Sequence, residues 1–228
     1  MQRAQILVVF DLDGTLTPHK SVWEYIHREL GTWEGRGEGH LRDWEAGRIN
    51  DAEFALVDAM EWKGRHVDEI RQVVGGIPIL PGAREVVDFL KDKGCRVIIL
   101  SSGLDVLAGR VADELGITEH YSNKLVVAKD GILTGRDEYL VPISAKGEVL
   151  EKIQASCGIG PDDTIAIGDG STDIPMFQRA AVSFAINDAG PETIAAATHH
   201  VKNLAELKYA LHGIFRLHSK PSFKIQDK

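Results

Sequence analysis

The sequence predicts an α/β fold in which a doubly wound parallel sheet carries an all-helical segment inserted after its first strand. Short apolar runs, typical of buried strands, alternate along most of the chain with segments whose apolar residues recur at helical spacing. The stretch after the first run shows helical spacing alone. The chain has 228 residues, of which 43% are hydrophobic and 26% charged, so it is long enough for one substantial core with an insert.

The first predicted strand is the apolar run at residues 6–9, which leads into Phe-Asp-Leu-Asp-Gly-Thr-Leu-Thr at residues 10–17. Side chains alternate along a strand, so Asp11 and Asp13 point to the same side, and Gly14 lets the backbone turn away. Parallel strands of open α/β sheets present their ligand sites at this end. Two carboxylates held there can bind a hard cation such as Mg²⁺, or one can attack an electrophile while the other moves protons.

Taken alone, the octet is also compatible with an acidic turn, because Asp and Gly are common in turns for local reasons. An EF-hand loop does not fit, because the required acidic spacing and the final Glu are absent. A second acidic segment far downstream favours a functional site. The apolar run at residues 164–167 is followed by Gly-Asp-Gly-Ser-Thr-Asp, so Asp169 and Asp173 can complete a cage of oxygen ligands with Asp11.

The predicted insert extends from about Lys20 to Ile79 and contains three helical patterns. Asn50 and Glu53 form a plausible capping pair at the start of the second helix. No segment of the insert has the pattern of a strand. The apolar positions of the three helices are Val22, Tyr25, Ile26 and Leu30, then Phe54, Val57 and Met60, then Val67, Ile70 and Val74.

All four tryptophans, Trp23, Trp33, Trp44 and Trp62, fall within the insert, which is therefore expected to have its own aromatic core. The glycine-rich stretch at residues 31–39 superficially resembles a phosphate-binding loop. It does not follow a strand, it lacks the Lys-Ser/Thr ending, and its two glutamates would repel phosphate. We expect a mobile connector there.

The rest of the chain returns to alternating strands and helices. Helices are expected over residues 83–90, over residues 104–115 with Gly116 at the end, and from Lys146 to Gly158. Strands are expected at residues 97–99 and 182–186, with a hairpin over residues 124–134 around Asp130-Gly131. His199-His200 is expected to form a surface turn, and the polar residues from about Ser219 are expected to be loose.

Two further short segments accompany the two acidic segments described above. Ser101 and Ser102 follow the predicted strand at residues 97–99, and Lys146 precedes a helical segment. The four pieces, in this order, resemble the four motifs of the haloacid dehalogenase superfamily, and the resemblance covers nearly the whole chain. A helical insert directly after the first motif is similar to the helical cap of the phosphoserine phosphatase branch. The resemblance therefore implies a Rossmann-like core over residues 1–18 and 80–228, and a cap over residues 19–79.

The resemblance also implies roles for individual residues. Asp11 would be the nucleophile that forms an aspartyl-phosphate, and Asp13 the general acid and base. Mg²⁺ would be held by Asp11, the main-chain carbonyl of Asp13 and Asp169, with Asp173 supporting these ligands or joining through water. Lys146 would neutralise charge in catalysis. The phosphate and the substrate would be bound by Ser101, the backbone amides of Ser102 and Gly103, Lys20 and Thr172.

An acid at position 13 favours hydrolysis over phosphoryl storage, because storing relatives generally carry Thr there. The leading hypothesis is a Mg²⁺-dependent phosphatase acting on a small phosphorylated metabolite. A phosphotransferase or mutase that passes the phosphoryl group to a second alcohol is the alternative. A non-enzymatic binding module on the same fold is a third hypothesis, which the complete acidic set disfavours.

Two positions of the sequence bear on the identity of the substrate. Phosphoserine phosphatases typically place a Glu shortly after the first motif for the substrate ammonium and an Arg in the cap for its carboxylate. Here the first position is Lys20, and the cap stretch at residues 54–60 contains no Arg. Lys20 is therefore expected to favour substrates with negative charge beyond the phosphate and to disfavour phosphoserine.

The bulk composition excludes several classes. A net charge of −8 argues against a broad nucleic-acid surface. Cys95 and Cys157 are too few for a disulfide framework and are expected to be small buried thiols. No apolar run approaches membrane-spanning length and no signal peptide is evident, so a reducing cytoplasm is the expected setting. Oligomeric state stays open.

Overall fold

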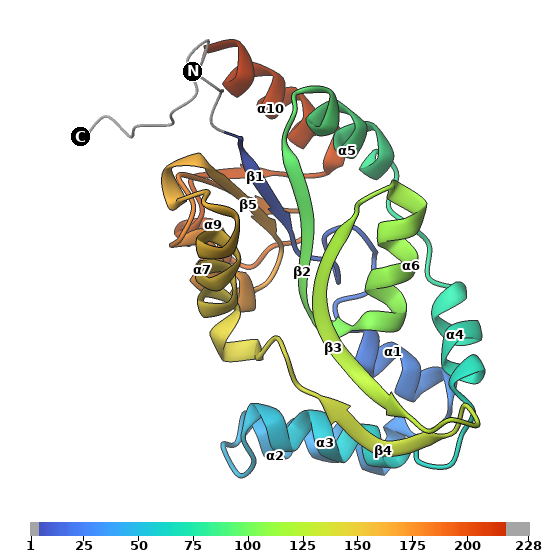
Figure 1. The fold of residues 1–228 in the computed structure, drawn as a ribbon. Helices are drawn as coiled ribbons and strands as arrows, with labels where there is room; N and C mark the ends of the chain where they lie inside the picture. Colours follow the sequence, from blue (N-terminus) through green and yellow to red (C-terminus); the bar gives the residue numbers. More distant parts are fainter. Residues whose placement is uncertain (1–4, 218–228) are drawn as a thin grey trace.

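The computed structural model describes residues 5–217, which form a seven-stranded sheet covered by helices on both faces (Figure 1). The strand order across the sheet is β4-β3-β2-β1-β5-β6-β7. All neighbouring pairs are parallel except β3 and β4, which are antiparallel. The strands are β1 (Leu7–Phe10), β2 (Arg96–Leu104), β3 (Glu119–Val127), β4 (Leu133–Glu138), β5 (Thr164–Gly168), β6 (Val182–Ile186) and β7 (His199–Val201). The predicted doubly wound α/β fold is confirmed.

The strand β1 lies at the centre of the sheet, and all four of its residues are buried. Its last residue, Phe10, pairs with Ile99 of β2 on one side and with Ile167 of β5 on the other. This register brings the residues that follow Phe10 level with Leu100 and Gly168. The first, second and fourth motifs therefore meet at one edge of the sheet.

Side chains of β1 alternate between two apolar clusters, as a strand buried on both faces requires. Val8 and Phe10 pack with the cluster that includes α5 (Ala83–Asp92), α6 (Asp105–Leu115) and α10 (Leu204–Leu217). Leu7 and Val9 pack on the other face, whose cluster includes residues of α7 (Lys146–Cys157) and α8 (Ile174–Phe177). The short helix α9 (Pro191–Ala196) contacts α8 and β6.

The insert between β1 and α5 is helical as predicted, but it contains four helices where the sequence indicated three, because α2 was not predicted. Its helices are α1 (Val22–Glu29), α2 (Glu38–Glu45), α3 (Asp51–Glu61) and α4 (Val67–Gly75). The predicted cap of α3 is confirmed, because the Asn50 side chain accepts from the Glu53 amide at 3.0 Å while the Glu53 side chain accepts from the Asn50 amide at 2.8 Å.

The expectation of a mobile connector at residues 31–39 is wrong. A π-helical turn spans Trp33–Gly37 and leads directly into α2. Trp33 is 8% exposed, so its ring anchors the turn, and Thr32 lies 2.7 Å from the His27 ring through its hydroxyl. The high glycine content concealed this turn, because Gly35 supplies a left-handed conformation (φ 78°) that lets the backbone reverse.

The predicted aromatic core of the insert is present, but it is divided. Trp62 is fully buried and stacks on Trp23 with ring centroids 5.6 Å apart. Trp44 stacks instead on Phe54 at 5.5 Å. The second pair belongs to α2 and α3, close to the strand β4, against which α3 packs (Figure 1).

Several smaller expectations need correction. The predicted hairpin is present, but β3 and β4 extend beyond residues 124–134. His199-His200 is not a turn, because both residues belong to β7, where His199 pairs with Phe184 and its ring stacks on that side chain. Cys95 is buried as expected, whereas Cys157 is only half-buried. The segment from Ser219 lies outside the described residues.

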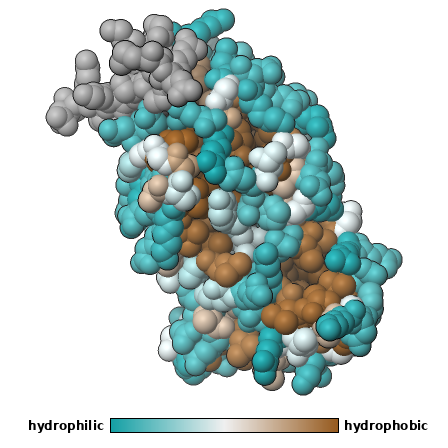
Figure 2. Space-filling view, viewed as in Figure 1, coloured by the Kyte–Doolittle hydropathy of each residue, from teal (hydrophilic) through white to brown (hydrophobic). Residues whose placement is uncertain are grey.

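The hydropathy of the surface differs between the two ends of the face shown in Figure 2. Figure 2 shows hydrophobic side chains exposed in the lower half, where β3, β4 and the inserted helices meet, and mostly hydrophilic ones around α5. Within residues 5–217, no helix combines the length and the apolar character needed to cross a membrane.

Candidate active site

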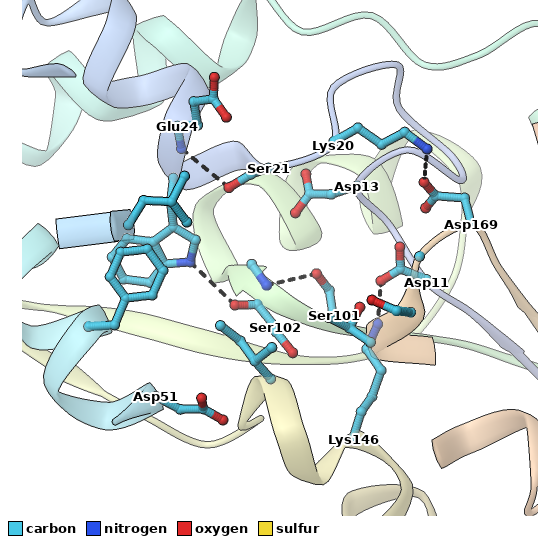
Figure 3. Close-up of a pocket in the computed structure, with 18 of the residues that line it drawn as sticks. Asp11, Asp13, Lys20, Ser21, Glu24, Asp51, Ser101, Ser102, Lys146 and Asp169 are labelled. Carbon is cyan, nitrogen blue, oxygen red and sulfur yellow. Dashed lines mark hydrogen bonds and ion pairs between the residues drawn. The ribbon is translucent and has the colours of Figure 1, made fainter. Parts of the chain in front are cut away.

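A cavity of about 410 Å³ lies between the carboxyl edge of the sheet and the inserted helices (Figure 3). Every residue predicted for the site except Asp173 lines it, and Asp173 is fully buried just behind the lining. The predicted residues that line it are Asp11, Asp13, Lys20, Ser101, Ser102, Gly103, Lys146, Asp169 and Thr172.

Asp11 directly follows β1 and is 6% exposed. Its amide donates to Ile167 at 2.8 Å, which continues the pairing with β5. Lys146, the first residue of α7, is fully buried and donates from Nζ to one carboxylate oxygen of Asp11 and one of Asp173, both at 2.6 Å. The Lys146 ammonium therefore lies between two carboxylates, one that follows β1 and one that follows β5.

The surroundings of Asp11 and Lys146 shift the pKa values of both groups. Burial raises the pKa of Asp11 well above its usual range, the nearby Asp173 raises it further, and Lys146 opposes both. Burial alone would lower the pKa of Lys146, but the carboxylates of Asp11 and Asp173 outweigh it and the net shift is upward. Lys146 is thus held as a permanent cation next to Asp11.

Asp13 lies on the same side as Asp11, as the alternation along β1 predicts. Burial raises its pKa to about 7, although hydrogen bonding to the backbone of Val22 and the charge of Lys146 act in the opposite direction. The Asp13 Oδ1 atom is buried without a hydrogen-bond partner. A carboxyl group with these properties is suited to carry a proton near neutral pH.

Gly103 makes the position of Asp13 sterically feasible. A Cβ on Gly103 would lie 2.4 Å from Asp13 Oδ2 and 3.0 Å from Ser101 Oγ. Any larger residue would therefore displace Asp13 or Ser101. The glycine is required here for close packing, and the expected binding of phosphate by its backbone amide stays a prediction.

The donor set fits a hard divalent cation. One carboxylate oxygen each from Asp11, Asp169 and Asp173 lies within 4.8 Å of the other two, and such cations prefer oxygen ligands. Gly14 adopts φ 79°, and a Cβ there would lie 2.3 Å from Asp169 Oδ2. The first loop thus leaves Asp169 the space to reach this cluster.

Both carboxylate oxygens of Asp173 already accept hydrogen bonds within the protein. Its Oδ1 accepts from Lys146, and its Oδ2 accepts from the amides of Asp169 and Gly170 at 2.9 and 3.0 Å. These bonds fix the loop that carries Asp169. The contacts support the positioning role that was one of the two expected for Asp173.

Ser101 and Ser102 lie in the last part of β2, before α6 begins at Asp105. The Ser101 hydroxyl accepts from the Gly103 amide at 2.9 Å. The Ser102 carbonyl accepts from the Trp23 indole at 3.3 Å and from the Asn123 amide at 2.8 Å, whereas its hydroxyl is buried without a partner. In this arrangement the Gly103 amide donates within the protein, and the expected binding of phosphate by the Ser102 and Gly103 amides stays a prediction.

Lys20 lines the cavity, as its sequence position suggested, and its ammonium forms an ion pair with Asp169. Figure 3 shows this pair at the opposite end of the view from Glu24 and Asp51. Burial raises the pKa of Asp169, and the hydrogen bond from Lys20 lowers it. The charge of Lys20 therefore acts at the acidic end of the cavity. Its expected preference for anionic substrates stays a prediction.

Sequence reasoning missed one partner of the acidic cluster and one contact that holds the neighbouring loop. Thr15 is fully buried, and its hydroxyl lies 3.0 Å from Asp169 Oδ1 and 3.4 Å from Asp11 Oδ2. Asn187, after β6, adopts φ 57° and donates to the Gly14 carbonyl at 2.6 Å. Thr15 belongs to the first octet, so it could have been suspected. Asn187 comes from a segment that carries no motif.

The inserted helices form the far wall of the cavity, and this wall is largely apolar. Its aromatic and aliphatic residues come from α1, α2, α3 and the π-helical turn, with two more from the segment before α7. They are Trp23, Trp33, Leu41, Trp44, Phe54, Ala55, Tyr139 and Ile143.

Comparisons with known proteins agree with this geometry. Residues 8–178 match the family model described as haloacid dehalogenase-like hydrolase. A phosphoserine phosphatase from Methanocaldococcus jannaschii is 33% identical over 81% of this chain and 87% of its own. One from Idiomarina loihiensis is 31% identical over 91% of this chain and 94% of its own.

Solved structures show the same relationship. A phospho-aspartyl intermediate analogue of phosphoserine phosphatase superimposes with a TM-score of 0.77 and 32% identity, covering 91% of this chain and 99% of that one. A substrate-bound phosphoserine phosphatase complex gives 0.77 and 31%, with the same coverage of both chains. The matched residues 8–178 include the inserted helices and the acidic residues Asp11, Asp169 and Asp173, and so the chain belongs to the haloacid dehalogenase-like hydrolases, in their phosphoserine phosphatase-like group.

Proposed function

We propose that the protein is a Mg²⁺-dependent phosphatase that hydrolyses a small phosphomonoester through an aspartyl-phosphate on Asp11. The observation that carries this proposal is the setting of Asp11, a buried carboxylate at the end of the central strand, bonded to Lys146 at 2.6 Å and close to Asp169. Residues 19–79 would act as the cap, and residues 1–18 and 80–228 as the catalytic core.

In the first step, an Asp11 carboxylate oxygen attacks phosphorus. The bond between phosphorus and the alcohol oxygen breaks, and its electron pair stays on that oxygen. Lys146 holds Asp11 Oδ1, so Oδ2 is the oxygen available for attack. Asp13, with its pKa raised to about 7, supplies the proton that the departing alcohol oxygen needs.

In the second step, water attacks the phosphorus of the aspartyl-phosphate. Asp13, now ionised, accepts a proton from this water, as microscopic reversibility requires. The bond between phosphorus and Asp11 breaks, inorganic phosphate leaves, and both carboxyl groups return to their starting states. The products are the free alcohol and phosphate.

Mg²⁺ would be held by Asp11, Asp169 and the main-chain carbonyl of Asp13, with Asp173 fixing the loop of Asp169. When bound, the ion would offset the repulsion between an anionic nucleophile and an anionic phosphate. Lys146 would serve the same purpose through its contact with Asp11 Oδ1. Ser101, Ser102, Thr172 and Lys20 line the remaining space around the phosphoryl group and would donate to its oxygens.

The direct test is phosphate release from p-nitrophenyl phosphate with Mg²⁺, with EDTA as the control. Hydrolysis that depends on the metal supports the proposal, and its absence in fully folded protein contradicts it. The alternative, transfer to a second alcohol, shares the first step. It is distinguished by adding candidate alcohols and measuring new phosphomonoesters instead of free phosphate.

A further inference from the structure

We infer that the alcohol portion of the substrate is apolar and carries no carboxylate. This inference rests on the proposed hydrolysis and specifies which phosphomonoesters the cavity selects. It depends on the charges and the apolar surfaces at the end of the cavity that lies away from Asp11.

No free cation is available at this end. Among the described residues that line the cavity, the cationic side chains are Lys20 and Lys146. Lys20 is paired with Asp169, and Lys146 lies between Asp11 and Asp173. Both cations therefore belong to the phosphoryl end. A carboxylate on the alcohol would lose its hydration without gaining a positively charged partner, which is unfavourable.

The acids that the inserted helices contribute already have partners. Glu24 accepts from Arg28 at 2.8 Å on the same helix. Asp51 accepts from the Ser144 hydroxyl at 2.6 Å.

The third of these acids, Asp58, is 3% exposed and lies 2.8 Å from the His40 ring and 3.2 Å from the His27 ring. Together with Glu24 and Asp51 it would repel a carboxylate. Because all three are partnered, none of them requires a cation from the substrate.

The remaining surface at this end is apolar. Three tryptophans line the cavity, and the indole nitrogens of two of them are engaged, since Trp23 donates to the Ser102 carbonyl at 3.3 Å and Trp44 donates to Asp51 at 2.8 Å. Trp44 stacks on Phe54 at 5.5 Å, and Phe54 and Trp33 also line the cavity. Aromatic and aliphatic groups of a substrate would be stabilised by contact with such a wall.

Three alkyl phosphates test the inference, and none of them has the activated phenolate leaving group of p-nitrophenyl phosphate. They are ethyl phosphate, 2-phenylethyl phosphate and O-phospho-L-serine, each assayed with the wild-type protein and Mg²⁺. We expect kcat/KM for 2-phenylethyl phosphate to exceed that for ethyl phosphate by about tenfold or more, because a phenyl ring is buried. O-phospho-L-serine should fall below ethyl phosphate.

Variants of α3 locate the effect in the cap. Phe54→Ala should lower kcat/KM for 2-phenylethyl phosphate about tenfold more than kcat/KM for ethyl phosphate, so that the preference between the two substrates is lost. Leu56→Ala is the matched control, because Leu56 lies on the same helix, is 39% exposed and is not part of the lining. Phe54→Arg would supply the missing cation, so it should raise the activity on O-phospho-L-serine.

The outcomes separate this inference from the proposed function. If O-phospho-L-serine is hydrolysed as well as or better than 2-phenylethyl phosphate, the inference is overturned and the proposed hydrolysis stands. If none of the three releases phosphate while the protein is folded by circular dichroism, the proposed hydrolysis is contradicted, and the inference with it. The wild-type comparison needs no variant and remains decisive if a substitution impairs folding.

Discussion

Asp51, the first residue of α3, accepts two hydrogen bonds from Ser144, one from its amide at 2.9 Å and one from its hydroxyl at 2.6 Å. Ser144 precedes Lys146 by two residues, and Lys146 binds Asp11 at 2.6 Å. A side chain of the inserted helices thus holds the segment that leads into α7. The position of the inserted helices and the position of Lys146, the proposed catalytic lysine, are connected through one carboxylate.

Asp51→Asn is expected to loosen this connection. An amide keeps the size of the side chain, but it loses charge-assisted bonding to Ser144, which should reduce the free energy of unfolding by about 1 kcal/mol. KM should rise more than kcat falls, because the residue lies at the cavity wall and does not touch Asp11. Asp68→Asn, an exposed acid of α4 paired only within the insert, is the control. Equal effects of both substitutions would contradict the link.

The same contact predicts a pH dependence. Burial raises the pKa of Asp51, but hydrogen bonds from Ser144 and Trp44 outweigh it, so the net pKa is lowered. A group with a lowered folded-state pKa contributes stability above its unfolded pKa of about 3.9, and this is lost as pH falls through the lower folded value. The stability difference between wild type and Asp51→Asn should therefore be constant near neutral pH and shrink below about pH 4. Chemical denaturation at several pH values measures it.

Asp11→Asn should abolish turnover and leave the fold intact. The amide has nearly the size of the carboxylate but cannot form the bond to phosphorus effectively. Beryllofluoride, which mimics an aspartyl-phosphate, should protect wild type against thermal unfolding and should not protect the variant. Asp113→Asn, an exposed position of α6, should behave as wild type. Residual activity in Asp11→Asn comparable to wild type would rule out the covalent scheme.

Metal dependence can be tested on the same assay. EDTA should stop hydrolysis, Mg²⁺ should restore it, and Ca²⁺ should support it poorly, because Ca²⁺ takes more ligands at longer distances. Asp169→Asn should raise the Mg²⁺ concentration needed for half-maximal activity by tenfold or more, with weaker Mg²⁺ binding by calorimetry as an independent readout. Full activity in excess chelator would mean that the acidic cluster does not act through a metal.

Lys20→Met separates two interpretations of this lysine. Because its ammonium pairs with Asp169 at the phosphoryl end, we expect kcat/KM to fall about tenfold for all phosphomonoesters alike. A loss confined to substrates with a second negative charge would instead support the interpretation based on sequence position. Parallel measurements on ethyl phosphate and on a carboxylate-bearing phosphate distinguish the two.

The site was predictable from sequence where a motif follows a strand. Asp11, Ser101 and Asp169 each come at or after a buried apolar run, and the carboxyl ends of parallel strands meet, so their proximity follows from the fold class alone. Lys146 was recognised by its place in the motif order. Its bond to Asp173 was not, because that contact depends on how α7 packs beside the loop after β5.

The parts that sequence could not supply are contacts between distant, unpatterned segments. The bond from Asn187 to Gly14 joins two loops whose separation in sequence gives no indication of contact. The turn at Trp33–Gly37 was mistaken for a connector because glycines weaken the helical pattern, and a buried Trp decides the structure there. His199 was assigned to a turn because a three-residue edge strand is too short to show alternation.

The central place of β1 has a consequence for the synthesis of the chain. The strand that carries Asp11 is made first, yet one of its two neighbours, β5, begins only at Thr164. Until that segment leaves the ribosome, β1 presents an open apolar edge, and such edges are templates for aggregation. A chain interrupted before β5 is therefore expected to be insoluble and inactive, whereas one interrupted after α9 would already contain every residue of the proposed reaction.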